Sequence, residues 1–242
     1  MVQNITDPVI RTKVKLLLED TRLRKRRKRL TYNTVSRSYV YDSKWFRAAE
    51  IAFSFLFLSL TSPIWIAVSL VIFLSDGQPV LFRQYRLGKN GKIFKIFKFR
   101  TMRKDAEEIL KHDILLYERY IVNNYKLPVD EDPRLLRIGK FLRRWSLDEI
   151  PQFINVIIGD MHIIGPRPIV KDELERYGQD ADTFLSVKPG ITGLWQVAGR
   201  SDVPYPDRKY LDLLYIQHKS FKLDLTILFK TVWKVIKRDG AY

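Results

Sequence analysis

The feature that most constrains the fold is a long apolar segment with a proline at its centre. Residues 48–75 carry no charge apart from Glu50, and the run is long enough to span a membrane. Ser62-Pro63 interrupts it, and proline removes a helical hydrogen bond and clashes with the preceding turn. Each half has about 14 residues, or roughly 20 Å of helix, which is too short to cross a core of about 30 Å. We therefore expect two short helices that meet at Ser62-Pro63.

Basic residues flank the apolar segment on both sides. Because such residues prefer the cytoplasmic face, equal preference at both ends favours a segment that enters and leaves by one face. The sequence thus predicts a re-entrant helical hairpin, in which Thr61 or Ser62 bonds the carbonyls freed at the bend. A tilted, proline-kinked span with a translocated basic loop is the alternative. The flanking residues are Lys44 and Arg47 before the segment and Arg83, Arg86, Lys89 and Lys92 after it.

The charge balance points to an anionic partner. The chain has 43 Lys and Arg against 27 Asp and Glu, a net charge of +16. Nucleic acid, anionic lipid or a phosphorylated substrate would suit it. Arg22–Arg29 holds seven basic residues in eight and precedes the apolar segment, a position where basic clusters bind anionic headgroups at about 1 kcal/mol per charge. No nucleic-acid motif is present, so we expect anionic membrane lipids and no nucleic acid.

Cysteine and histidine usage excludes several kinds of chemistry. The sequence has no cysteine, which excludes disulfides, thiolate catalysis and cysteine-based zinc sites. The three histidines, His112, His162 and His218, show no metal-ligand spacing. Phosphate-binding fingerprints of the P-loop and dinucleotide types are missing as well.

After Asp76-Gly77 the composition becomes that of an α+β domain, mostly helical with a small β-hairpin or sheet. Val80–Arg86 and Lys92–Phe99 are rich in β-branched and aromatic residues, and Asn90-Gly91 between them is a strong hairpin signal. Helical periodicity and end signals predict helices near 103–120, 135–145, 168–177, 206–218 and 223–237. We expect a basic N-terminal extension at 1–44, a re-entrant membrane helix at 45–76 and a catalytic domain on the cytoplasmic face at 77–242.

The last of these helices is amphipathic. Its apolar stripe is bordered by lysines, which suits a helix lying in the membrane interface. Packing on the domain core would explain the stripe equally well. The stripe consists of Leu225, Leu228, Phe229, Val232, Val235 and Ile236.

Two adjacent carboxylates, Asp148 and Glu149, stand out in this basic chain. Ser146 and Glu149 fit a capping box, and Asp148 in the first turn would suit the helix dipole. A structural role at the start of a helix would therefore explain both acids without a catalytic function. Pro151 would then fall inside the helix and cost a backbone bond. If the helix begins at Pro151 instead, both acids lie just outside its N-terminus beside the Arg143-Arg144 pair.

Arginines in two other tight segments favour a functional interpretation of the acids. Arg100 lies in KFRTM and Arg167 in GPRP, and arginine suits bidentate phosphate recognition. Acids among such arginines are typical of a divalent-metal phosphoryl-transfer site, where cations neutralise phosphate oxygens so that a carboxylate can approach. One of two adjacent acids can then act as nucleophile.

These motifs together resemble the bacterial sugar transferases, the monotopic polyprenyl-phosphate hexose-1-phosphate transferases, also called phosphoglycosyl transferases. The resemblance runs from about Trp45 to the C-terminus. It rests on several motifs in the same order. These are the apolar segment with Ser62-Pro63, GQPVLFRQYRLGKNGKIFKIFKFRTM at 77–102, DPRLLRIGKFLRRWSLDEIPQFINVIIGDMHIIGPRP at 132–168, KPGITGLWQVAGR at 188–200 and the ending RDGAY.

The resemblance implies transfer of a sugar-1-phosphate from a UDP-sugar to undecaprenyl phosphate. Asp148 would attack the β-phosphate, releasing UMP and forming an aspartyl phosphosugar that undecaprenyl phosphate resolves. Glu149 would assist, and Mg²⁺ would bind at Asp148 and Glu149. Ser62 and Pro63 would set the membrane bend. The resemblance also suggests phosphate contacts by Arg100, Arg143, Arg144 and Arg167, and nucleotide-sugar contacts by Gly190, Thr192 and Gln196.

By the same resemblance the chain would belong to the bacterial inner membrane, with its catalytic domain on the cytoplasmic face. It would perform the first membrane step of surface polysaccharide or glycoconjugate synthesis, such as exopolysaccharide, capsule or O-antigen. A homo-oligomer is compatible with the sequence. The competing hypothesis is a non-catalytic basic membrane adaptor that binds anionic lipids.

Overall fold

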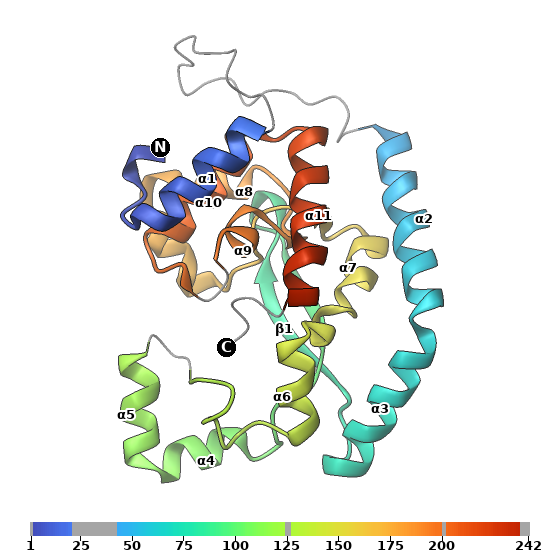
Figure 1. The fold of residues 1–242 in the computed structure, drawn as a ribbon. Coiled ribbons are helices and arrows are strands. Elements are labelled where there is room, and N and C mark those ends of the chain that lie inside the picture. The colour runs from blue at the N-terminus through green and yellow to red at the C-terminus, as the bar shows by residue number, and fades with distance from the viewer. Residues whose placement is uncertain (1, 21–42, 124–126, 200–201, 238–242) are drawn as a thin grey trace.

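The computed structural model describes residues 2–20, 43–123, 127–199 and 202–237; the basic run Arg22–Arg29 and the ending at 238–242 lie outside these ranges. The described chain is mostly helical with two small sheets, which confirms the α+β prediction (Figure 1). Its helices are α1 (Pro8–Asp20), α2 (Lys44–Leu60), α3 (Ser62–Asp76), α4 (Ala106–His112), α5 (Ile114–Val122), α6 (Arg137–Arg144), α7 (Gln152–Ile158), α8 (Ala181–Leu185), α9 (Leu194–Ala198), α10 (Asp207–His218) and α11 (Phe221–Lys237). Its strands are β1 (Leu81–Leu87), β2 (Ile93–Phe99), β3 (His162–Ile164) and β4 (Gly190–Thr192), and 3-10 turns include Lys89–Gly91, Leu147–Glu149 and Lys171–Asp180.

The apolar segment forms α2 and α3, which meet at a bend of 60°. Pro63 lies in the first turn of α3, where its missing N–H costs no helical bond. Thr61 Oγ1 donates to the Phe57 carbonyl at 2.7 Å, so one carbonyl near the bend is satisfied as expected. Within the described ranges no single helix is both apolar and long enough to cross a membrane, whereas the bent pair together meets that test by length and composition. A 60° bend fits a broken span as well as a re-entrant segment, so the predicted re-entrant hairpin is not confirmed.

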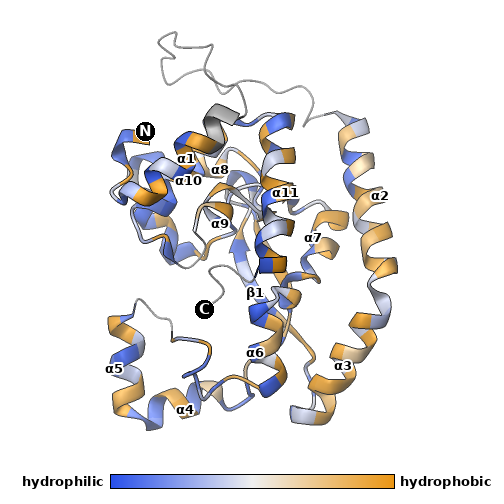
Figure 2. Ribbon diagram, viewed as in Figure 1, coloured by the Kyte–Doolittle hydropathy of each residue, from blue (hydrophilic) through white to orange (hydrophobic). Residues whose placement is uncertain are grey.

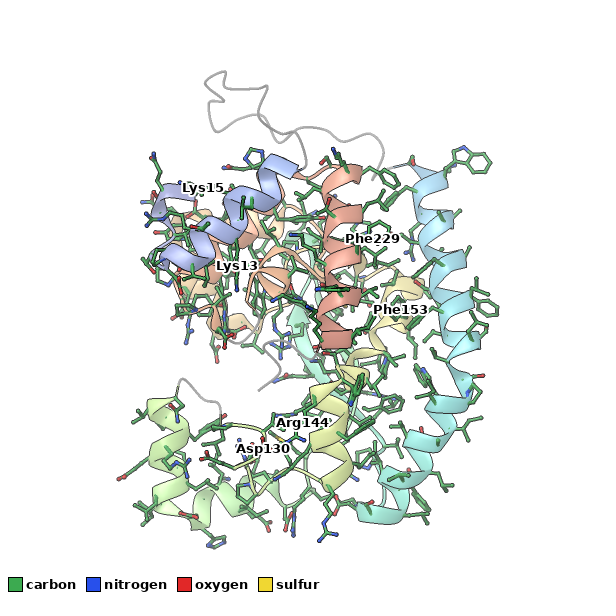
Figure 3. All side chains as sticks on the ribbon, in the orientation of Figure 1. Lys13, Lys15, Asp130, Arg144, Phe153 and Phe229 are labelled. Carbon is green, nitrogen blue, oxygen red and sulfur yellow. The ribbon has the colours of Figure 1, made fainter. Side chains whose placement is uncertain are left out.

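The two arms pack on different parts of the domain. On α2, the Phe57 ring lies 4.4 Å from the Phe153 ring of α7, centroid to centroid, and Figure 3 shows Phe153 between the domain and α2. On α3, Val68 and Ile72 are buried with Leu142 of α6 in one cluster. The outward faces of both arms are apolar (Figure 2) and expose large side chains, among them Phe55, Leu60, Ile66 and Leu74.

A buried hydrogen-bond network attaches α2 to β3. Glu50 is 5% exposed, and its Oε2 lies 2.7 Å from His162 Nδ1. Its Oε1 accepts a hydrogen bond from the Ile163 amide at 3.1 Å. Arg47, one turn earlier, donates to the Ile157 carbonyl at 2.8 Å. The single charge of the apolar segment is thus satisfied by the domain.

Strands β1 and β2 form the predicted antiparallel hairpin, with Leu81 opposite Phe99 and Leu87 opposite Ile93. Asn90 and Gly91 in the connecting turn have φ of 57° and 75°, the left-handed region that the Asn-Gly signal predicts. Asn155 of α7 forms hydrogen bonds with the edge of β2 that does not pair with β1. Its Nδ2 donates to the Lys95 carbonyl at 2.7 Å and its Oδ1 accepts from the Phe97 amide at 3.0 Å. Helix α7 is therefore fixed to the hairpin.

Strands β3 and β4 pair in parallel and place two loops in close contact. A Cβ on Gly190 would lie 2.0 Å from the Gly165 nitrogen, and one on Gly193 would lie 2.2 Å from the Gly165 oxygen. Only residues without a side chain allow this approach. The GPRP loop that carries Arg167 is therefore held directly against β4.

The largest core cluster joins the N-terminal and C-terminal parts of the chain. Ile5, Ile10 and Val14 are buried with side chains of α9, α10 and α11. Asp207 at the start of α10 accepts hydrogen bonds from the amides of Thr6 and Asp7 at 2.9 and 3.1 Å. The described part of the predicted N-terminal extension thus packs on the domain (Figure 1).

Two predicted helices differ in the structure. The helix expected at 103–120 is two helices, because Asp113 ends α4 and caps α5 by accepting from the Leu116 amide at 2.9 Å. The helix expected near 168–177 is a 3-10 segment, Lys171–Asp180, interrupted at Gly178. Helix α11 confirms the prediction for 223–237, and much of its apolar stripe is exposed, with Phe229 at 71% and Ile236 at 64%.

Candidate active site

The two carboxylates lie on the 3-10 turn Leu147–Glu149, between α6 and α7. Ser146 has φ of 55° and its side chain makes no capping hydrogen bond, so the capping-box interpretation is wrong. The helix begins after Pro151 instead, which is the alternative that the proline favours. Asp148 and Glu149 therefore precede the N-terminus of α7, outside any regular helix.

Glu149 is held by two cations from distant segments. Lys98 Nζ on β2 lies 2.7 Å from Glu149 Oε1, and Arg167 NH1 of the GPRP loop lies 3.6 Å from the same oxygen. The side chains of Lys98 and Glu149 are 16% and 25% exposed, so the pair is screened only in part. The structure thus brings Glu149 and Arg167 together, as the sequence suggested, and adds Lys98.

Asp148 is half-buried beside the same charges. Burial raises the pKa of Asp148 to about 6; the negative charge of Glu149 adds to this rise, while Lys98 and Arg143 oppose it. A carboxylate that is poorly solvated is more reactive toward phosphorus once cations replace the missing water. Asp148 is accordingly the better candidate nucleophile of the two.

The side chains of Arg143 and Arg144, at the end of α6, have different partners. Arg143 donates from Nε to Thr101 Oγ1 at 3.0 Å, and burial lowers its pKa while Asp148 opposes that change. Arg144 forms an exposed ion pair with Asp130, which Figure 3 labels. The structure therefore places Arg143 near Asp148 and gives Arg144 a surface partner.

Arg100 is used inside the fold. It is 6% exposed, pairs with Asp76 at the end of α3, and donates to the Pro79 and Gly77 carbonyls at 2.6 and 2.7 Å. These contacts join α3 to the β1–β2 hairpin. Arg100 thus has partners within the fold, and its contact with a phosphate stays a prediction.

The residues predicted to contact the nucleotide sugar also have partners within the domain. Thr192 is 6% exposed and its hydroxyl lies 2.8 Å from that of Thr231 on α11. Gln196 Nε2 donates to the Ile191 carbonyl at 3.2 Å. Gly190 contacts Gly165 as described above. Gly190 thus lies against the GPRP loop, and Thr192 and Gln196 are hydrogen-bonded within the domain. Their contacts with a nucleotide sugar stay a prediction.

Sequence reasoning missed Arg86 and Arg208 as site residues. Arg86 on β1 is near enough to Glu149 for that charge to raise its pKa, against a larger lowering by burial. Arg208 and Arg167 lie over the same Trp195 ring, at 4.9 and 5.8 Å from its centroid. In the sequence these arginines looked like ordinary strand and helix charges, and no local signal separates them from Arg83 or Lys209.

A buried acid lies beneath this arginine cluster. Asp212 of α10 is 1% exposed and accepts from the Tyr177 hydroxyl at 3.0 Å. Burial raises the pKa of Asp212 to about 8, although Tyr177 and Arg167 oppose that rise. The Oδ1 atom of Asp212 has no hydrogen-bond partner within the described residues.

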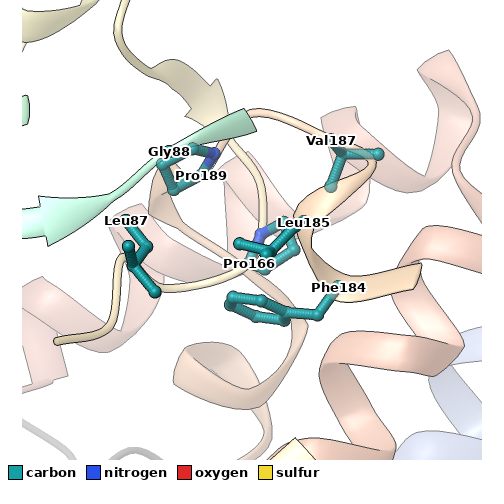
Figure 4. A pocket seen from close by; sticks show the side chains of 7 residues that line it. All are labelled: Leu87, Gly88, Pro166, Phe184, Leu185, Val187 and Pro189. Carbon is teal, nitrogen blue, oxygen red and sulfur yellow. The ribbon is translucent and has the colours of Figure 1, made fainter. Parts of the chain in front are cut away.

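A small pocket lies beside the GPRP loop (Figure 4). Its lining contains no charged side chain, so it does not suit a phosphate or a nucleotide. The lining residues are Leu87, Gly88, Pro166, Phe184, Leu185, Val187 and Pro189.

The carboxylates present suit Mg²⁺ only if substrate phosphates and water complete its coordination. In the part of the chain that the structure describes, no three His, Cys, Asp or Glu side chains gather as a protein-only site requires. Mg²⁺ commonly binds through one or two carboxylates plus substrate phosphates and water. Asp148 and Glu149 supply such a pair, and the poor solvation of Asp148 favours a cation there.

Adjacent carboxylates among lysine and arginine side chains are typical of sites that handle phosphorylated ligands. Residues 41–238 match the family model described as bacterial sugar transferase. The chain belongs to the bacterial sugar transferase family.

Relatives within the family are similar over most of this chain. The undecaprenyl-phosphate galactose phosphotransferase of Salmonella typhimurium is 44% identical over 201 residues, covering 81% of this chain and 41% of the relative. The UDP-glucose:undecaprenyl-phosphate glucose-1-phosphate transferase of Escherichia coli is 38% identical, with coverages of 81% and 41%. The exopolysaccharide production protein ExoY of Sinorhizobium fredii is 40% identical, covering 81% of this chain and 87% of the relative. The chain thus spans about two fifths of the first two relatives and most of the third.

Proposed function

We propose that this protein transfers a sugar-1-phosphate from a UDP-sugar to undecaprenyl phosphate. The observation that carries the proposal is the Asp148-Glu149 pair, held among Lys98, Arg143 and Arg167 in a member of the bacterial sugar transferase family. The names of two relatives specify transfer to undecaprenyl phosphate, of galactose in one case and glucose-1-phosphate in the other.

In the proposed first step, a carboxylate oxygen of Asp148 attacks the β-phosphorus of the UDP-sugar. The bond from that phosphorus to the bridging oxygen breaks, and UMP leaves with the electron pair. Lys98, Arg143 and Arg167 neutralise the phosphate oxygens as charge moves between them. Mg²⁺ held by Asp148 and Glu149 would add positive charge at the same phosphates.

In the second step, a phosphate oxygen of undecaprenyl phosphate attacks the phosphorus of the aspartyl phosphosugar. The aspartyl oxygen–phosphorus bond breaks, which gives undecaprenyl-diphospho-sugar and restores the carboxylate of Asp148. Glu149 remains paired with Lys98 and Arg167 and orients both cations toward the phosphorus. This would be the first membrane step of a polysaccharide or glycoconjugate pathway.

The bent helix pair supports a position at the cytoplasmic face of the bacterial inner membrane. Helix α7 packs on α2 and α6 packs with α3, so the carboxylate turn between α6 and α7 is tied to both arms. The apolar outer faces of both arms and of α11 suit insertion from one face, with lysines at the headgroups. A soluble nucleotide sugar and a lipid phosphate could then meet at Asp148.

The chemistry is tested by UMP release from a panel of UDP-sugars with undecaprenyl phosphate and Mg²⁺. We expect activity from the wild type and its loss, by at least a thousandfold, in Asp148→Asn. Asp105→Asn is the control, because Asp105 forms an exposed pair with Arg103. Undiminished release by Asp148→Asn would show that another group is the nucleophile. A wild type that binds anionic vesicles but releases no UMP would favour the membrane adaptor.

The membrane topology is tested by labelling single cysteines, since the chain has none of its own. Cysteines replacing Lys44 and Lys104 mark the two ends of the helix pair, and both positions are exposed. We expect both to react only from the cytoplasmic side. Reaction from opposite sides would establish a kinked span instead.

A further inference from the structure

A partly unsatisfied guanidinium lies beside the proposed active site. The side chain of Arg86 is 14% exposed, and its buried Nε has no hydrogen-bond partner in the described part of the chain. One terminal nitrogen donates to Gln84 Oε1 at 2.6 Å. The other lies 3.9 Å from Glu173, beyond hydrogen-bond range. Buried donors without partners are rare in native proteins and call for an explanation.

Arg86 shares its surroundings with two further arginines. Burial lowers the pKa of Arg86 to about 10, and the positive charge of Arg167 lowers it further. Burial also lowers the pKa of Arg208, and Arg167 again contributes. Arg167 thus repels both Arg86 and Arg208 in a poorly solvated place, while Glu173 attracts both and Glu149 attracts Arg86.

The cluster has the features of an anion site. Arg167 and Arg208 lie over the Trp195 ring, and Arg86 is held by its hydrogen bond to Gln84 on the same strand. Such planar donors, ordered before binding, suit bidentate contacts with phosphate oxygens. The repulsion between them is relieved when an anion binds.

The position of the cluster indicates which phosphate binds there. The charges of Lys98 and Arg143 act on Asp148, whereas those of Arg167 and Glu173 act on Arg86; the charge of Glu149 acts on both groups. In phosphoryl transfer the attacking and leaving oxygens lie roughly in line on opposite sides of phosphorus. A leaving group displaced by Asp148 therefore departs on the side away from Asp148, and the arginine cluster contacts the neighbouring Glu149 through Arg167 at 3.6 Å.

We propose that Arg86, with Arg167 and Arg208, binds the α-phosphate of the nucleotide, the phosphate that leaves as part of UMP. This inference rests on the proposed function, because it assumes a nucleotide diphosphate sugar as donor. It assigns Arg86 to the leaving group and separates it from the cations around Asp148.

The test compares the binding of UMP and of uridine to purified protein by calorimetry, without turnover. Arg86→Gln should weaken UMP binding at least tenfold and leave uridine binding unchanged. Arg86→Lys should retain part of the affinity, since lysine keeps the positive charge but lacks the paired N–H donors of the guanidinium. Arg83→Gln is the matched control: Arg83 is on the same strand, faces the other side, and lies over the Phe97 ring. Equal UMP affinity in the wild type and Arg86→Gln would overturn the proposal.

A second measurement separates binding from a purely structural role. The ligand-free Arg86→Gln variant should melt at the same temperature as the wild type or higher, because a strained cation has been removed. UMP should raise the melting temperature of the wild type more than that of the variant. A lower melting temperature with an unchanged UMP response would overturn the inference.

Steady-state kinetics distinguish the two possible phosphate sources. Arg86→Gln should raise KM for the UDP-sugar and leave KM for undecaprenyl phosphate unchanged. The opposite result would assign the cluster to the lipid phosphate and overturn the inference. Arg86-dependent UMP binding in a wild type that releases no UMP would contradict the proposed function and leave this nucleotide site established.

Discussion

Glu50 and His162 are 112 residues apart in sequence and 2.7 Å apart in the structure. The carboxylate of Glu50 sits in an otherwise uncharged helical segment and is 5% exposed, so its burial depends on the domain that provides His162. Burial lowers the pKa of His162, with Glu50 opposing, so the imidazole tends toward its neutral form. The contact links the placement of α2 directly to β3.

Removing the Glu50 carboxylate should loosen this attachment. Glu50→Ala leaves the Ile163 amide and His162 Nδ1 without their partner, which should cost about 1–3 kcal/mol of unfolding free energy. Glu50→Gln keeps an acceptor for the amide and should cost less. Thermal unfolding of detergent-purified protein measures both changes. Glu108→Gln, at an exposed position of α4, is the control, and an effect of Glu50→Ala no larger than that of the control would disprove the linkage.

The Lys98–Glu149 pair should be coupled in stability and needed for activity. Lys98→Gln removes a cation from the place where the donor phosphates are expected, so kcat/KM for the UDP-sugar should fall on the order of tenfold or more. A double-mutant cycle with Glu149→Gln should give a coupling energy of about 0.5–3 kcal/mol. Lys95→Gln, on the other face of β2 and over the Tyr85 ring, should leave kcat/KM unchanged. Additive single effects would indicate that the two groups act independently.

Gly190→Ala should disturb the GPRP loop. The new Cβ would lie 2.0 Å from the Gly165 nitrogen, which is backbone and cannot move away alone. We expect a loss of about 3 kcal/mol or more in stability, since overpacking commonly costs 1–3, and a fall in UMP release because Arg167 is displaced. Gly88→Ala tests ordinary crowding, because its nearest neighbour would be 3.1 Å away. A fully active, equally stable Gly190→Ala would show that the loop does not require this close contact.

Asp212 should make the stability depend on pH. Burial raises its pKa to about 8 from the ordinary value near 3.8, so the folded state binds more protons than the unfolded state between these values. Stability should therefore fall as pH rises through this window, and level off above about 8. Asp212→Asn removes the titration, so its melting temperature should decline less between pH 6 and pH 9 than that of the wild type. An equal decline in melting temperature with pH for the two proteins would contradict the raised pKa of Asp212.

Local sequence signals predicted the elements that depend on local chemistry. Asn90-Gly91 gave the hairpin and Pro63 the break between α2 and α3, because both act through their own backbone dihedrals. The capping box failed for a local reason as well: Ser146 follows the end of α6 in a left-handed conformation, and Pro151 starts the next helix. Helical periodicity continues through Asp113, so it predicted one helix where the cap at Asp113 separates α4 from α5.

The rest of the site depends on contacts between distant segments. Lys98 meets Glu149 across 51 residues, and Asn155 meets Phe97 across 58. In the sequence, Arg100 and Arg86 are equivalent basic residues of the hairpin region. In the structure, Arg100 bonds to Asp76 and to backbone carbonyls, whereas Nε of Arg86 has no partner among the described residues. Charge and spacing do not reveal which partner a side chain will find.

The two hydrogen bonds of Asn155 have a consequence for folding. They occupy the outer edge of β2 where a neighbouring strand would otherwise pair, which also blocks edge-to-edge association there. If β2 slipped by one residue, Lys98 would turn to the opposite face and Asn155 would lose both partners. A misregistered hairpin is thus penalised by the same helix that follows the carboxylate turn, so correct strand pairing and the position of that turn depend on each other.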